Sequence, residues 1–272
     1  MPSKISVIIP TIPGREDMLK RLLDSLPSYC EKIVVPDEGM SLAAKRNKGA
    51  RQAEGAYLLF IDDDNYLKMD ALQRMMEAYD ELFGVMGIMA CYDDKPLVVA
   101  DGGSLRWYLP SVMDGVNTNK RIYDIDLNVY EVDEVANAFM IPRRVFELAG
   151  GFDEDNFPID LDEADICKRI KDMGYLIVMN PKAICYHKSQ TYSYIPDFRR
   201  PMNAYFMGRN RVLYQKKHLN PLKYLTYLMV FMPPFVAFYC LSLLYRRKPG
   251  MILHFLKGVL HGLQGRRQNQ YF

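Results

Sequence analysis

Three consecutive aspartates, Asp62, Asp63 and Asp64, directly follow the apolar segment AYLLFI. If that segment is a buried parallel strand, its acids lie at the carboxyl edge of an α/β sheet, where ligands bind. Adjacent carboxylates repel one another, so a buried cluster needs a compensating cation, and Mg²⁺ or Mn²⁺ shared with substrate phosphates would supply it. An exposed acidic turn before a helix would need no ligand, and the residues alone leave both interpretations open.

A second acidic cluster, Asp160, Asp162, Glu163 and Asp165, precedes and begins the segment DEADICKRIKDMG. Acids in the first turn of a helix are commonly caps that complement the helix dipole. Alternatively, one acidic cluster holds metal and diphosphate while the other supplies a base to an incoming hydroxyl.

Two familiar phosphate-binding motifs are absent from the sequence. The loop after the first strand reads TIPGRED and has no GxGxxG, and no GxxxxGK[ST] occurs. This argues against a dinucleotide dehydrogenase and a P-loop NTPase. Phosphate would then be bound by metal and by side chains such as Lys45 and Arg46, unless these two residues only form a solvated helix face.

The elements that would position these residues alternate between strand and helix. β-Branched runs and helical periodicity predict strands at 4–10, 32–35, 56–61 and 85–90, with helices at 18–26, 42–53 and 70–82 between them. After an irregular stretch, 101–134, we expect a strand at VANAFMIP, helices at 143–149 and 162–173, and extended structure at LIVMNPKAICYH. This order predicts a doubly wound, mostly parallel α/β sheet.

Composition narrows the class of protein. The chain has 272 residues, 49% apolar and 25% charged, with a net charge of +2, which excludes intrinsic disorder and does not suggest a nucleic-acid partner. The five cysteines form no CxxC pair, so we expect buried thiols and not a zinc site or disulfides. The short apolar run before Pro10 is too short for a secretory signal.

The last part of the sequence changes character. RRPMNAYFMGRNRVLYQKKH is basic and aromatic, and 222–245 is nearly uncharged and long enough to cross a bilayer. Pro233 and Pro234 would split it into two halves, and basic residues flank both ends, so we expect a re-entrant or interfacial hairpin. The amphipathic segment 251–263 suits a headgroup plane, although both segments could instead pack on protein.

Several segments, in this order, resemble the family 2 glycosyltransferases, inverting enzymes of the GT-A fold. They are VIIPT, PDEG, AAKRNKGARQAEGAYLLFIDDDN, AFMIPRRVFELAGGFDE and DEADICKRIKDMGY, spread over about residues 4 to 190. GRNRVLYQKKHL further resembles membrane-associated, rhamnosyltransferase-like members. The resemblance implies a Rossmann-like, mostly parallel sheet flanked by helices in a catalytic domain, 1–195, and a helical membrane-associating extension, 196–272.

The resemblance also implies a site for a nucleotide-sugar donor. Its residues would be Pro10, Thr11, Asp37, Glu38, Lys45, Arg46, Asp62 and Asp63. PDEGM departs from the family's usual DDGS, which leaves open whether Asp37 or Glu38 contacts the base.

Metal and base follow from the same resemblance. Asp64 would bind Mn²⁺ or Mg²⁺, with His187 as a further ligand unless it is a core histidine. Glu163 would be the catalytic base, with Asp162 beside it. Trp107 and Tyr108 could stack on a sugar or simply pack.

The expected function is therefore metal-dependent, inverting sugar transfer from a nucleotide sugar to an acceptor hydroxyl. The acceptor would be a lipid-linked glycan or a cell-surface polysaccharide precursor, at an anionic membrane surface on the cytoplasmic face, with peripheral or monotopic attachment. The alternatives are a nucleotidyltransferase of sugar-nucleotide synthesis and an inactive membrane-tethered scaffold. The sequence gives neither the sugar nor the oligomeric state.

Overall fold

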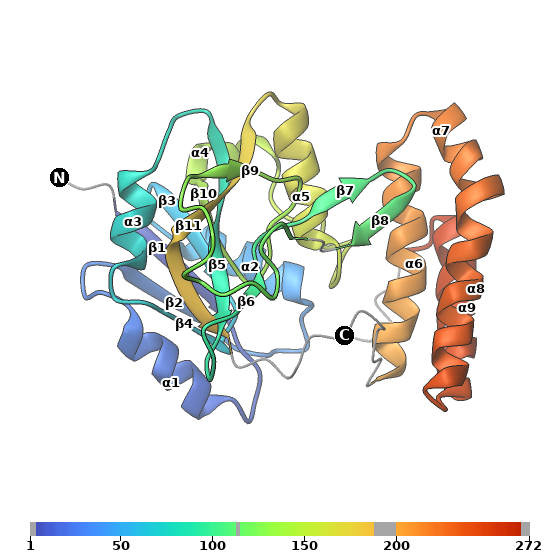
Figure 1. Ribbon diagram of the computed structural model, residues 1–272, viewed down its shortest axis with the longest axis horizontal. Coiled ribbons are helices and arrows are strands. Elements are labelled where there is room, and N and C mark those ends of the chain that lie inside the picture. Colours follow the sequence, from blue (N-terminus) through green and yellow to red (C-terminus); the bar gives the residue numbers. More distant parts are fainter. Residues whose placement is uncertain (1–3, 113–114, 188–199, 268–272) are drawn as a thin grey trace.

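A mixed β-sheet lies at the centre of the protein in the computed structural model, which describes residues 4–112, 115–187 and 200–267 (Figure 1). Its strands follow the order β2-β1-β3-β10-β5-β11-β4, with β6 paired to β5 and β9 to β11. Their bounds are β1 (Ile5–Pro10), β2 (Glu31–Val35), β3 (Tyr57–Ile61), β4 (Asn65–Leu67), β5 (Phe83–Tyr92), β6 (Val98–Ala100), β9 (Tyr130–Glu131), β10 (Ala138–Pro142) and β11 (Leu176–His187).

The predicted α/β fold class is confirmed, but the sheet is less parallel than expected. β1 is parallel to β2 and β3, and β11 is parallel to β5. β10 runs antiparallel to both of its neighbours, β3 and β5, and β4 runs antiparallel to β11. A buried apolar segment such as AFMIP can form a central strand that is parallel or antiparallel to its neighbours. Its apolar pattern therefore does not specify the direction of the strand.

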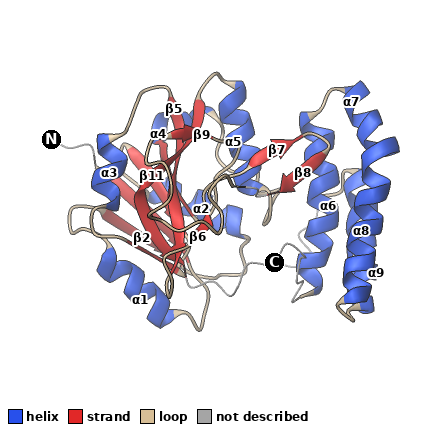
Figure 2. Cartoon of the chain, in the orientation of Figure 1, coloured by secondary structure: helices blue, strands red, loops and turns tan. Residues whose placement is uncertain are grey.

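Helices cover both faces of this sheet (Figure 2). Their bounds are α1 (Glu16–Ser25), α2 (Leu42–Gln52), α3 (Ala71–Glu77), α4 (Arg143–Leu148) and α5 (Asp162–Asp172). α2 begins as the sequence predicts, because the Ser41 hydroxyl accepts a hydrogen bond from the backbone of Ala44 at 3.2 Å. α3 ends earlier than predicted, since the Asp80 carboxylate caps a turn by accepting from the backbone of Leu82.

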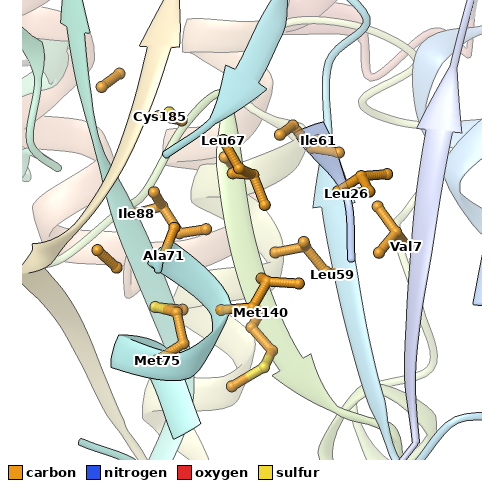
Figure 3. Packing of buried hydrophobic residues seen from close by; sticks show 14 of the residues in the cluster. Val7, Leu26, Leu59, Ile61, Leu67, Ala71, Met75, Ile88, Met140 and Cys185 are labelled. Carbon is orange, nitrogen blue, oxygen red and sulfur yellow. The ribbon is translucent and has the colours of Figure 1, made fainter. Parts of the chain in front are cut away.

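Two apolar layers hold the helices to the sheet. One contains side chains of β1 and β3 with those of α1 and α3, among them Val7, Leu59, Leu26 and Met75 (Figure 3). The other joins the opposite face of the sheet to α2, α4 and α5. Burial on both faces explains why the strand sequences read as continuous apolar runs.

The stretch predicted to be irregular, 101–134, carries a small hairpin, β7 (Ser104–Arg106) and β8 (Leu109–Val112). It projects from the sheet towards the C-terminal helices (Figure 1). Trp107 and Tyr108, in its turn, pack on Phe231 with ring centroids 5.3 and 5.6 Å apart. Both aromatics therefore connect the hairpin to the C-terminal helices.

The C-terminal helices lie side by side at one end of the molecule (Figure 1). They are α6 (Pro201–His218), α7 (Pro221–Thr226), the π-helical segment η1 (Tyr227–Phe231), α8 (Met232–Tyr245) and α9 (Pro249–Gln264). Glycines bring α6 and α9 together: a Cβ atom added at Gly262 would lie 2.6 Å from the carbonyl oxygen of Arg209. The expected boundary between residues 195 and 196 lies outside the described residues.

The expected break at Pro233 and Pro234 is wrong. Pro221–Tyr245 forms one helix of 25 residues, long and apolar enough by length and composition to cross a membrane, and only 17% of its most apolar window is buried. The two prolines lack the N–H groups that would bond to Met229 and Val230 four residues earlier. Both carbonyls lie in the π-helical segment η1, and the helix continues through the two prolines.

The cysteines are free thiols, as predicted. Cys30, Cys91, Cys167 and Cys185 are buried, and Cys240 is half-buried between the C-terminal helices.

Candidate active site

A cavity of about 510 Å³ opens where β1 and β3 end. The loops after these strands form one wall, the start of α2 another, and the beginning of α6 closes the far side. The lining residues are Pro10, Ile12, Arg15, Asp37, Gly39, Met40, Leu42, Lys45, Asp62, Asp63, Asp64, Ile159, Arg200 and Met202. A cavity thus lies at the carboxyl edge of the sheet, where the sequence predicts a ligand site.

The three aspartates have different partners although they are adjacent. Asp62 accepts a hydrogen bond from Arg46 at 3.1 Å. Asp63 is almost fully buried and accepts from the Thr11 hydroxyl at 2.7 Å and from Arg15 at 2.5 Å. Asp64 lies 3.2 Å from Arg15, so the triplet is not an exposed acidic turn.

Arg46 joins the two acidic clusters. Its side chain is fully buried between the rings of Phe139 and Phe152. One guanidinium nitrogen lies 2.6 Å from Asp162, and the other lies 2.8 Å from Glu163. Because that second nitrogen also contacts Asp62, one cation holds carboxylates from β3 and α5 at a single point. Arg46 is therefore not on a solvated helix face.

The backbone conformation before α5 orients the acids of the first turn of this helix towards Arg46. Asp160 and Leu161 both have positive φ, 64° and 66°, in the left-handed region that non-glycine residues seldom adopt. Asn210 of α6 holds this turn by donating to the carbonyl oxygens of Ile159 and Asp160 at 2.6 and 2.7 Å. Asp162 begins the helix and does not cap it through its side chain. The tertiary contact with α6 thus maintains a strained entry into the helix.

Burial changes the proton affinity of both first-turn acids. Desolvation raises the pKa of Glu163 to about 8, although the Arg46 charge opposes the rise and Asp162 adds to it. Desolvation likewise raises the pKa of Asp162, again against Arg46. The side chain of Glu163 remains 18% exposed, whereas that of Asp162 is 1% exposed. Glu163 is therefore the more accessible acid of this pair.

The structure distinguishes Asp37 from Glu38. Asp37 borders the cavity and lies 3.1 Å from Lys45, which also donates to the carbonyl oxygen of Thr11 at 3.1 Å. Glu38 does not border the cavity and pairs with Lys48 at 2.6 Å. Lys45 is buried and points towards the end of β1, so it too lies off the solvated face of α2.

Asp64 and His187 are the residues that could hold a divalent ion. β4 and β11 pair antiparallel with His187 opposite Asn65, which brings His187 Nε2 to 3.5 Å from Asp64 Oδ1. His187 Nδ1 is buried and has no hydrogen-bond partner among the residues that the structure describes. Burial raises the pKa of Asp64, with His187 opposing the rise and Asp62 adding to it.

These two residues do not make a complete metal site. In the described parts of the chain, no three His, Cys, Asp or Glu side chains are grouped so that they could hold a metal ion. Mg²⁺ is commonly bound by one or two carboxylates together with substrate phosphates and water. The residues present fit an ion of that kind, which would arrive with a diphosphate.

Sequence reasoning did not single out Arg15, Arg200 or Met202. Arg15 ion-pairs with two of the three aspartates, and its signal was a lone basic residue in the loop TIPGRED. Arg200 and Met202 reach the cavity from the start of α6, far along the chain, and no local pattern marks them.

A mixed α/β sheet with flanking helices and an acidic loop at the edge of a cavity has the arrangement of the GT-A glycosyltransferases. The chain belongs to the glycosyltransferase-like family 2, whose model matches residues 17–216. No curated protein is similar enough in sequence to match.

Solved structures share the fold at low sequence identity. The mannosyltransferase PcManGT from Pyrobaculum calidifontis, in complex with GDP-Man and Mn²⁺, has a TM-score of 0.54 and 13% identity, over 98% of this chain and 89% of that chain. TarS 1–349 from S. aureus has a TM-score of 0.49 and 15% identity, over 97% and 92% of the two chains. The similarity to the mannosyltransferase is a similarity of fold.

Proposed function

We propose that this protein is a metal-dependent, inverting glycosyltransferase that moves a sugar from a nucleotide-sugar donor to an acceptor hydroxyl. The observation that carries the proposal is the junction at Arg46, which links the candidate base, Glu163, to Asp62, and Asp62 borders the cavity. Family membership and the Mn²⁺ and GDP-Man bound by the mannosyltransferase of similar fold support it.

In this proposal the donor nucleotide occupies the 510 Å³ cavity. Pro10 and Asp37 border the end that the base would fill, and Lys45 keeps Asp37 and the end of β1 in place. Asp62 faces the sugar side of the donor. Thr11 and Asp63 act on the donor indirectly, because Asp63 accepts hydrogen bonds from both Thr11 and Arg15. Glu38, bound to Lys48, has no role in this arrangement.

The reaction needs one base. Glu163 takes the proton of the acceptor hydroxyl while that oxygen forms its bond to the anomeric carbon, and the bond from this carbon to the diphosphate oxygen breaks on the opposite face. Configuration is inverted in a single step. Asp162 and Arg46 orient Glu163, because Asp162 fixes the guanidinium that Glu163 contacts.

Asp64 and His187 would hold the Mn²⁺ or Mg²⁺ ion. When bound, the ion would offset negative charge on the departing diphosphate. Arg15 lies between Asp63 and Asp64 and adds a fixed positive charge at the same place.

We further propose that the helices from α7 to α9 bind the protein to an anionic membrane surface, as a peripheral or monotopic attachment for a lipid-linked acceptor. Residues 201–272 contain eleven Lys and Arg and no Asp or Glu. Large apolar side chains are exposed along α7, η1, α8 and α9, namely Leu222, Leu225, Met229, Val230, Phe238, Leu241, Leu244, Leu253, Leu256 and Leu260. A basic, apolar helical surface suits the interface of an anionic bilayer.

The orientation in that proposal is parallel to the membrane. α8 and α9 are joined by the basic turn Arg246, Arg247 and Lys248, which would have to enter the hydrocarbon if the pair inserted end-on. Lying flat keeps this turn in the headgroup region, on the cytoplasmic face.

The test is nucleotide release from UDP-, GDP- and dTDP-sugars by purified protein with Mn²⁺ or Mg²⁺, and again with chelator. We expect slow, metal-dependent hydrolysis of one donor, and loss of turnover with retained nucleotide binding in Glu163→Gln. Release of pyrophosphate from a nucleoside triphosphate would instead support a nucleotidyltransferase. Absence of both reactions, with no calorimetric binding of any nucleoside diphosphate, would support the inactive scaffold.

A further inference from the structure

A second cavity, of about 240 Å³, lies between α5, α6 and the β7–β8 hairpin, away from the donor cavity. It shares no lining residue with that cavity. Its walls are Leu105, Arg106, Trp107, Asp133, Lys168, Lys171, Asp172, Tyr214, Gln215, His218 and Leu219. The volume is below the usual range for drug-sized ligands, so it suits a single ring.

Gln215 gives this cavity an unused hydrogen-bond donor. Gln215 is 1% exposed and borders the cavity, and within residues 4–112, 115–187 and 200–267 its Nε2 atom has no hydrogen-bond partner. A buried amide nitrogen without a partner is costly, and a ligand hydroxyl would satisfy it.

Apart from Arg106, which is exposed to solvent, the charged groups around the cavity are already paired. Lys168 pairs with Asp172, Lys171 pairs with Asp133 at 2.8 Å, and His218 lies 2.8 Å from Asp165. The walls therefore provide nearly neutral polar groups, and they suit a ligand with hydroxyls better than a strong anion.

Aromatic side chains complete the cavity. Trp107 and Tyr214 border it from the hairpin and from α6. Trp107 is fixed by its edge-to-face contact with Phe231, so its position does not depend on a ligand. Apolar ring faces beside hydrogen-bonding groups match a sugar ring, whose C–H and O–H groups face different ways.

We propose that this cavity is a saccharide-binding site, which holds a sugar unit of the acceptor glycan away from the reacting hydroxyl. Its place supports the role, because Lys168 and Asp172 lie five and nine residues beyond Glu163 on α5, about 8 and 14 Å along the helix axis. The saccharide site stands on its own lining residues, whereas its role towards an acceptor rests on the proposed transferase function.

The single tryptophan makes a direct test possible. Trp107 is the one tryptophan in the chain, so tryptophan fluorescence, excited selectively over tyrosine, reports on this cavity. We would titrate the full-length protein with methyl glycosides of glucose, galactose, mannose, rhamnose, N-acetylglucosamine and glucuronic acid. We expect a saturable change in tryptophan emission with at least one glycoside, and heat of binding for the same glycoside by calorimetry.

Variants identify the site. Gln215→Leu should weaken that binding about tenfold, since it removes a buried hydrogen bond to the ligand. Gln52→Leu, an exposed glutamine at the end of α2, should leave it unchanged. Unchanged binding of nucleoside diphosphate to Gln215→Leu would show that this variant is folded.

Two results would overturn the saccharide site: no saturable change in emission or heat with any glycoside, or equal binding by wild type and Gln215→Leu. Failure of the transferase proposal would look different. A protein that binds a glycoside at Trp107 but no nucleoside diphosphate would contradict the transferase and leave the saccharide site intact, and the reverse pattern would contradict the saccharide site alone.

Discussion

Arg46 Nη2 lies 2.8 Å from Glu163 Oε1, and the Arg46 side chain is fully buried. The same nitrogen is 3.1 Å from Asp62. The candidate base is thus positioned by the cation that also holds the acidic loop after β3. Any change at Arg46 should affect stability and proton affinity together.

Replacing Arg46 by methionine should lower the free energy of unfolding by about 3–5 kcal/mol at neutral pH, because buried carboxylates lose their compensating charge. The loss should be smaller at acidic pH, where protonated carboxyls need no cation. Urea denaturation at both pH values measures this. Arg51→Met, an exposed site on the same helix, is the control and should change stability by less than about 0.5 kcal/mol. Equal effects of the two substitutions would contradict the central role of Arg46.

The pH dependence of transfer should reflect Glu163. Since burial raises the pKa of Glu163 to about 8 and a general base must be deprotonated, kcat/KM should rise about tenfold per pH unit below that value and level off above it. Steady-state kinetics from pH 6 to 9 measure the profile. Glu163→Gln should reduce the rate roughly 10²- to 10⁴-fold and abolish this limb. A limb that persists in Glu163→Gln would show that Glu163 is not the base.

Arg15 should compete with a divalent ion for Asp64. Removing its charge in Arg15→Gln should strengthen Mn²⁺ binding to the nucleotide-free protein several-fold, because Asp64 loses a competing cation. The same substitution should weaken binding of a nucleoside diphosphate. Mn²⁺ titration followed by electron paramagnetic resonance measures the first effect, and calorimetry the second. Arg21→Gln is the matched control, since Arg21 pairs with Asp93 instead. Weaker Mn²⁺ binding in Arg15→Gln would argue that Arg15 orders the acidic loop and does not compete for it.

The membrane surface proposed for α7–α9 can be tested at α9. Leu253 and Leu260 are 75% and 52% exposed, and their replacement by serine together should weaken binding to anionic vesicles about 10- to 100-fold, because two apolar side chains no longer leave water. Vesicle co-sedimentation at fixed ionic strength measures the change. Leu82→Ser with Leu148→Ser removes equally exposed leucines from the α/β unit and should have no effect. A wild-type protein that stays free of phosphatidylglycerol vesicles would rule out this surface.

Close packing of α6 on α9 depends on glycine. A Cβ atom at Gly258 would clash with the carbonyl oxygen of Tyr205, so Gly258→Ala should destabilise the protein by about 1–3 kcal/mol. Gly250 lies on the same helix with open space around it, and Gly250→Ala should be neutral or slightly stabilising. Thermal unfolding of the two variants measures the difference. If both behave alike, the two helices can separate without cost.

Much of the α/β unit could be predicted because local patterns specify it. Apolar runs give β1, β3 and β5, Ser41 marks the start of α2, and acids that follow a strand must lie at an edge of the sheet. Family membership was predictable for the same reason, since its motifs are short segments of strand and loop.

Other features were decided by contacts between distant segments. The direction of β10, the position of Asp37 but not Glu38 at the cavity, and the pairing of Asp63 with Thr11 and Arg15 depend on partners that no local pattern identifies. The same is true of the continuous helix across Pro233. A proline removes a backbone hydrogen bond from a helix, and the surrounding structure decides whether the helix ends there.

The sequence by itself determined which chemical groups this protein has and which elements they follow. The tertiary structure decided which of them meet, because burying Arg46 among carboxylates from two distant segments requires the complete core around it. Side-chain type and periodicity are local properties, whereas burial, pairing and pKa depend on the whole fold.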